Sequence, residues 1–146
     1  MTEQSKQLKV LLAVKALVQA ALPLATVTGF DGETSKPRRI GDHGHVIGHP
    51  GDPGDPEVDL SPLSYNYEHA IMLEIAAAEA AGGAELDAMI VAIGVAVRAA
   101  RTLGGLCEFV SAEAPDRNDR TVAGLATSNW AIVNIVAEYS TEDPLA

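Results

Sequence analysis

The sequence YNYEHAIMLEI, residues 65–75, decides the fold class, because its apolar and polar residues alternate with the two-residue period of a β-strand. The odd-numbered positions, from Tyr65 to Ile75, are aromatic, aliphatic or histidine. The even-numbered positions include Asn66, Glu68 and Glu74. This alternation predicts a strand with one face in a hydrophobic core and the other face toward solvent.

Helical patterns lie on both sides of this strand. Residues 4–22 place Val10, Leu11, Val14, Leu17 and Val18 on one stripe with a 3.6-residue period. Leu8 and Leu12 fall on the opposite side of that helix. Residues 84–103 are apolar nearly all round, with Val91 and Val95 away from the main stripe. A helix of this kind is covered on two sides, and we expect a neighbouring subunit to supply the second cover.

The remaining segments complete an α+β pattern. Short strands are expected at residues 24–30, 38–48, 106–110 and 121–126, and a long buried strand at residues 129–140. The order of helix, strands, helix and strands predicts one mixed or antiparallel sheet packed by two main helices. The 146 residues form a single domain, residues 1–146. Proline and glycine dominate residues 47–62, which predicts an extended loop that a neighbouring protein orders.

The charge of the chain excludes several functions. The net charge is −10, and residues 41–97 contain no lysine or arginine. Binding of nucleic acid needs clustered basic residues, and so does binding to an anionic membrane surface. The single cysteine, Cys107, excludes an internal disulfide. Two explanations of the acidic character of residues 41–97 stay open. These residues form a solubilising surface, or they form a surface that repels a polyanion or pairs with a basic partner.

The sequence offers little catalytic chemistry. His43, His45 and His49 lie near acidic residues and are metal-ligating types, but their Gly/Pro-rich context predicts an exposed polar loop and no metal site. Cys107 lies in the apolar run LCEFV and is expected in the core, and His69 is expected to be half-buried and hydrogen-bonded. We therefore expect neither catalysis nor a cofactor. A small metal-dependent or ligand-binding enzyme stays open as an alternative.

The chain resembles a known family in its element order and in two short sequence motifs. The motifs are DLSPLSYNYEH at residues 59–69 and RTLGG at residues 101–105. The chain is similar to the tail terminator, or tail completion, proteins of long-tailed phages and gene transfer agents. The resemblance covers about residues 8–141. It implies a structural virion protein without catalysis or cofactor. Neck or head-completion proteins and tail-tube proteins are the alternatives from the same group.

The resemblance also implies partners and a location. Such proteins form a hexameric ring on the last ring of the tail tube, stop tube growth and present the surface that joins the head. The implied partners are further copies of the chain, the tail-tube protein and a head–tail connector or neck protein, with no membrane involved. DNA passes through such a ring without specific binding. The implied location is the tail or neck of the virion, assembled in the host cytoplasm.

Apolar residues away from the expected core, together with two arginines, are the candidate contacts with other subunits or partners. Arg38 and Arg39 are expected to face acidic groups of a neighbouring subunit, away from the channel. Residues 41–97 and the acidic residues from Glu138 to Asp143 are the expected channel lining. The full set of candidate subunit or partner contacts is Leu8, Leu12, Arg38, Arg39, Val58, Leu60, Val91 and Val95.

Overall fold

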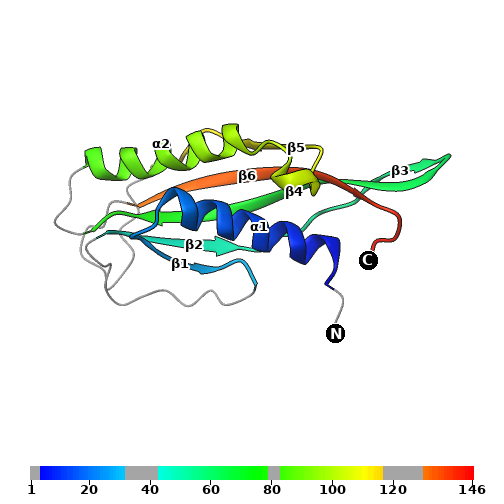
Figure 1. Ribbon diagram of the computed structural model, residues 1–146, viewed down its shortest axis with the longest axis horizontal. Coiled ribbons are helices and arrows are strands. Elements are labelled where there is room, and N and C mark those ends of the chain that lie inside the picture. The colour runs from blue at the N-terminus through cyan, green and yellow to red at the C-terminus, as the bar shows by residue number, and fades with distance from the viewer. Residues whose placement is uncertain (1–3, 32–42, 79–82, 117–129) are drawn as a thin grey trace.

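The computed structural model describes residues 4–31, 43–78, 83–116 and 130–146, and it shows two helices packed on one face of a mixed six-stranded sheet (Figure 1). The predicted α+β fold class is confirmed. In chain order the elements are α1 (Lys6–Ala21), β1 (Thr26–Gly29), β2 (His45–His49), β3 (Glu57–Leu60), β4 (Leu63–Ala76), α2 (Gly83–Ala99), a 3₁₀ turn η1 (Leu103–Gly105), β5 (Phe109–Ala112) and β6 (Trp130–Thr141).

The sheet is built on its two longest strands. Its order is β1-β2-β4-β6-β5, and β3 pairs with the first residues of β4. Strands β4 and β6 are antiparallel, in a register that runs from Tyr65 opposite Thr141 to Ala76 opposite Trp130. Only β1 and β2 are parallel, which makes the sheet mixed. The predicted strand at residues 65–75 is therefore the centre of the fold.

The core lies between the helices and the odd-numbered residues of β4 and β6. Ile71, Leu73 and Ile75 are completely buried, and Ile135 of the neighbouring strand is buried with them. The helices supply the other side of the core, with these buried residues: Val10, Leu11, Val14 and Val18 of α1, and Leu86, Met89, Ile93 and Val97 of α2. The alternation along β4 thus places one face against the helices, as its sequence predicts.

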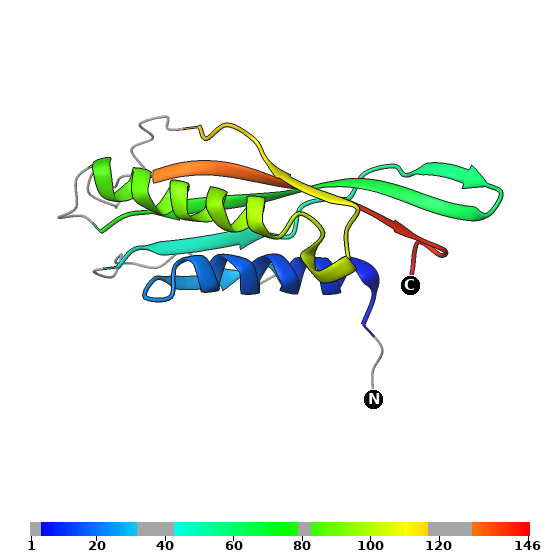
Figure 2. The same ribbon diagram turned by 45° about the horizontal axis from the view of Figure 1, so that its top comes forward.

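Local signals fix the ends of both helices. The Ser5 hydroxyl caps α1 by accepting a hydrogen bond from the Leu8 amide at 3.2 Å, and Pro23 follows the end of that helix. Glu85 lies in the first turn of α2 and Arg98 in its last turn, where each charge complements the helix dipole. Figure 2 shows the two helices side by side on the same face of the sheet.

A glycine in β2 makes room for an aromatic ring at the edge of the core. Phe30 is fully buried, and a Cβ atom at Gly48 would lie only 2.3 Å from the ring of Phe30. Since atoms cannot pack that closely, only glycine fits beneath this ring. The strand predicted at residues 24–30 is confirmed as β1, which ends immediately before Phe30.

Several predicted boundaries differ from the structure. The strand predicted at residues 38–48 begins at His45, and residues 38–42 lie outside the described residues. The strand predicted at residues 106–110 is β5, shifted to Phe109–Ala112. The strand predicted at residues 121–126 also lies outside the described residues. The buried strand predicted at residues 129–140 is confirmed as β6.

The extended loop predicted for residues 47–62 is wrong in its boundaries. Residues 47–49 belong to β2, and residues 57–60 form β3, which pairs with β4. The physical reason is that the prolines at 50, 53 and 56 lie between the two strands, where no ladder hydrogen bond is lost. The loop itself is thus reduced to the segment between β2 and β3.

Candidate assembly surfaces

The hairpin of β3 and the first residues of β4 extends beyond the layer of helices as an arm (Figure 2). Val58 pairs with Tyr65 and Leu60 with Leu63, so these four side chains share one face of the arm, called here the arm face. The arm face continues the core face of the sheet, but Val58 is 45% exposed and Leu60 is 82% exposed. The predicted contact residues Val58 and Leu60 are therefore available to a partner.

The second apolar surface lies on α2. Ala84, Ala88, Val91 and Val95 follow one another at three- and four-residue spacing on the exposed side of the helix, and they are called here the α2 stripe. Val91 is 54% exposed and Val95 is 50% exposed. The sequence-based expectation that α2 presents an apolar side away from its sheet is confirmed. The expectation that a neighbouring subunit covers it stays a prediction.

Two other predicted contact residues do not form such a surface. Leu8 and Leu12 are half-buried in the structure. The expectation that they lie on an open outer side of α1 is wrong. Arg38 and Arg39 lie outside the described residues, and so does Asp42.

Carboxylates gather on the sheet face opposite the helices, at the arm end. Glu68 lies directly opposite Glu138, and Glu57 lies opposite Asn66, so side chains of β3, β4 and β6 share this face. A shallow groove there, called here the acidic groove, is lined by these residues: Pro53, Gly54, Asp55, Glu57, Asp59, Asn66, Tyr67, Glu68, Glu108 and Glu138. None of them is basic, so the groove has a strong negative charge.

The described basic residues do not lie on the sheet face that contains the acidic groove. None of the six strands contains a lysine or arginine. The described lysines and arginines belong to α1, α2 and the residue pair that follows α2: Lys6, Lys9, Lys15, Arg98 and Arg101. Arg101 lies over the Phe109 ring at 4.9 Å and donates a hydrogen bond to the carbonyl oxygen of Val110. In the described part of the chain, positive charge is therefore confined to the helix side.

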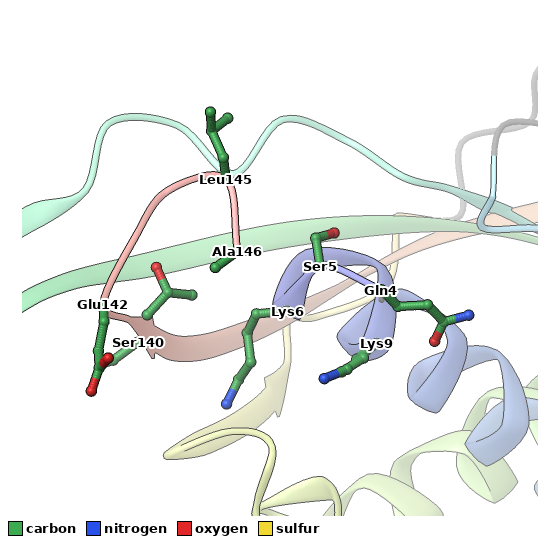
Figure 3. A pocket seen from close by; sticks show the side chains of 9 residues that line it. Gln4, Ser5, Lys6, Lys9, Ser140, Glu142, Leu145 and Ala146 are labelled. Carbon is green, nitrogen blue, oxygen red and sulfur yellow. The ribbon is translucent and has the colours of Figure 1, made fainter. Parts of the chain in front are cut away.

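A hollow at the start of α1 contains two of these lysines. Lys6 and Lys9 line it together with Ser140, Glu142 and Leu145 (Figure 3). It is open and lies where α1, the end of β6 and the last residues of the chain meet. Neither of the buried histidines, His45 and His69, lines this hollow.

Two of the three histidines, His45 and His49, do not lie in the exposed loop that the sequence predicts. His45 is buried in β2 and lies 2.9 Å from the hydroxyl of Thr28, and burial lowers the pKa of its imidazole. His49 pairs with Glu74 at 2.8 Å, whereas His43 is exposed. They differ from the prediction because β2 pairs with β1 and β4. Among the described residues, no group of three metal-ligating side chains is placed to hold a metal ion.

His69 is the most buried polar side chain of the core, with no exposed area. Its Nε2 atom donates a hydrogen bond to the carbonyl oxygen of Pro50, because a carbonyl can only accept. Its Nδ1 atom therefore accepts from the Tyr139 hydroxyl at 3.0 Å. Burial lowers the pKa of His69, although the Pro50 hydrogen bond and the charge of Asp52 oppose that shift. Through these two hydrogen bonds, His69 links Pro50, at the start of the segment between β2 and β3, to Tyr139 in the core.

Cys107 is buried, as predicted from its apolar neighbours. Burial raises the pKa of its thiol to about 11, and the nearby Lys6 charge opposes this shift only in part. Because the thiolate is the reactive form, such a cysteine is a poor nucleophile at neutral pH. Burial likewise raises the pKa of Tyr139 to about 12.

No protein-family model matches the chain, and no curated protein matches it. Within the described residues, neither helix has the length and apolar character needed to cross a membrane.

Proposed function

We propose that this protein is a tail terminator that forms a ring on the end of a phage-type tail tube, stops its growth and provides the surface that joins the head. Two observations support this proposal. The fold has the element order of the segments on which the resemblance rests, from α1 through the arm to β6. The chain also exposes apolar surfaces on the arm face and the α2 stripe, and such surfaces are typical of subunit contacts.

The observation that supports the proposal most is the separation of charge between the two layers. All described lysines and arginines belong to the helix side, and the opposite sheet face contains the acidic groove. A bore that transmits DNA must not hold it, and basic residues would bind the phosphate backbone. In the proposed ring, the acidic groove with Glu68 and Glu138 therefore faces the bore, and the helices face outward.

The proposed role is structural and not catalytic, and it requires no cofactor. The partners are further copies of the chain, most simply six, the tail-tube protein below the ring and a connector or neck protein above it. DNA passes without specific binding, since the acidic groove repels it. The proposed location is the tail or neck of the virion, with assembly in the host cytoplasm.

The mass of the assembly tests this function. Light scattering of the purified protein, alone and bound to tail tubes, is expected to give a multiple of the 15.2 kDa chain, six chains in the proposed ring. Assembly only in the presence of tubes fits the proposal, because the tube end is a template. A chain that stays monomeric both alone and on tubes contradicts it.

A further inference from the structure

His69 is a fully buried imidazole, and residues 50–56 between β2 and β3, called here the linker segment, lie against one edge of its ring. The carbonyl oxygen of Pro50 accepts the hydrogen bond from Nε2. A Cβ atom at Gly51 would lie 3.6 Å from the same nitrogen atom, so the backbone of Gly51 lies directly beside the ring. The first residues of the linker segment therefore cover this edge of the imidazole.

Little else holds the linker segment on the sheet. In the described part of the chain, the hydrogen bond from His69 is the one that joins it to another element. Its other hydrogen bond is internal, from the Gly54 amide to the Asp52 carboxylate. Residues 51, 52, 54 and 55 are exposed. A segment with so few attachments opens at a much lower cost in free energy than the whole domain.

Protonation of His69 does not fit the closed structure. In the neutral ring, Nδ1 accepts a hydrogen bond from the Tyr139 hydroxyl. A protonated ring donates from both nitrogen atoms, so the hydroxyl would have to turn and its own proton would lose this acceptor. Tyr139 is 2% exposed, and its hydroxyl has no second partner among the described residues. Protonation would therefore bury both a charge and an unsatisfied hydroxyl group.

The groups that surround the imidazole on the core side do not remove this cost. Desolvation by burial lowers the pKa of the ring and is the largest effect, whereas the Pro50 hydrogen bond and the charge of Asp52 oppose it. On β6, burial raises the pKa of Tyr139 to about 12, so this side chain is uncharged at neutral pH. Tyr67 of β4 stacks on Tyr139, with 5.6 Å between the ring centres.

The remaining charged groups nearby act on other partners or lie on the other face. Lys6 of α1 acts on Cys107, whose pKa is raised to about 11 by burial. Glu68 and Glu138 lie on the sheet face opposite the imidazole. The closed structure therefore disfavours the charged form of His69.

Opening of the linker segment removes the cost of protonation. When residues 50 and 51 move away, water reaches the imidazole and its pKa returns to the ordinary value of 6.5. Because the pKa is lower in the closed structure, the closed state has its full advantage above pH 6.5 and loses it as the pH falls below 6.5. From pH 8 to pH 5, the ratio of open to closed molecules rises by up to about 30-fold.

We propose that His69 is a pH-sensitive anchor, so that its protonation opens the linker segment while the helices and the sheet stay folded. This inference goes beyond the proposed function and does not depend on it. Pro53, Gly54 and Asp55 of the linker segment line part of the acidic groove. Acidification therefore changes the shape of that groove.

Distances between two spin labels test the opening. One nitroxide is attached at Asp55→Cys in the linker segment and one at Leu24→Cys before β1, where the native leucine is 72% exposed. Labelled chains are diluted with unlabelled protein, and pulsed electron paramagnetic resonance is recorded from pH 8 to pH 5. This range stays above about pH 4, where ordinary carboxylates titrate. The expected result is a narrow distance distribution at pH 8 and a second, broad population that grows on acidification.

A matched label pair shows whether the opening is local. Leu60→Cys with Leu24→Cys places one label at the tip of the arm, where the native leucine is 82% exposed. Because β3 stays paired with β4, this distribution is expected to stay narrow over the same pH range. The unmodified chain corrects for any labelling of Cys107, which is 5% exposed. No broad population at Asp55→Cys by pH 5 overturns the proposal. Broadening of both pairs together with loss of near-ultraviolet circular dichroism shows unfolding of the whole domain and overturns it equally.

His69→Gln identifies the group that titrates. Glutamine offers a donor and an acceptor but does not titrate, so the open fraction is expected not to change with pH. In the chain with the native histidine, ring resonances in nuclear magnetic resonance spectra supply a second criterion that needs no substitution at this site. The midpoint of opening is expected to coincide with the titration of His69 and not with that of His45 or His49. Opening that keeps its pH dependence in His69→Gln, or that follows another histidine, overturns the proposal.

Discussion

Replacing His69 by phenylalanine is expected to lower the free energy of unfolding by about 3 kcal/mol at pH 8, because two buried hydrogen-bonding groups lose their partner. Those groups are the carbonyl oxygen of Pro50 and the hydroxyl of Tyr139. Denaturant unfolding measures the change. The matched control Tyr139→Phe removes one of these groups together with its hydrogen bond, and we expect it to cost about 1 kcal/mol.

The same variant has a pH signature. The pKa of His69 is below its ordinary value of 6.5 in the folded state, so the unfolded chain binds more protons as the pH falls through 6.5. His69 therefore contributes stability that is present above pH 6.5 and is lost on acidification, and His45 acts in the same direction. The stability difference between the native chain and His69→Phe is expected to shrink below pH 6.5. A difference that grows on acidification would contradict the buried, neutral imidazole.

The second large effect is expected at Gly48. A Cβ atom there would lie 2.3 Å from the Phe30 ring, so Gly48→Ala forces the ring or β2 to move. The expected loss in the free energy of unfolding is about 3 kcal/mol, the upper part of the range for overpacked cores. Urea midpoints measure it.

Gly94→Ala is the matched control for this prediction. Gly94 lies inside α2, and nothing lies within 4 Å of an added Cβ atom. Because alanine favours helix over glycine, this change is expected to raise the free energy of unfolding by about 0.5–1 kcal/mol. Equal midpoints for the Gly48 and Gly94 variants would contradict the packing of Phe30 on β2.

Periodicity made the main elements of this fold predictable. The alternation in residues 65–75 gave β4 and its buried face, and the 3.6-residue pattern gave α1 and α2 within a few residues. Strand β3 was not predictable, because EVDL is short and lies among prolines. It exists as a strand because it pairs with β4, which local sequence cannot show.

The candidate surfaces were predictable in part for the same reason. Val91 and Val95 lie on the open side of α2 because helix geometry alone determines that side. Leu8 and Leu12 were misjudged because their half-burial depends on the folded chain, which a helical pattern alone does not show. The hydrogen bonds of His69 join residues 19 and 70 positions away, so no local pattern signals them. The sequence shows that acidic residues cluster along the chain, but only the strand register places Glu68 and Glu138 on one face.

Electron microscopy of tail tubes assembled with the purified protein tests the central proposal most directly. The tail terminator account predicts a ring with six-fold symmetry at one end of each tube, no protein along the shaft, and no further growth when tube subunits are added. Incorporation along the length of the tube, or tubes that keep growing from ends to which the protein is bound, would contradict it.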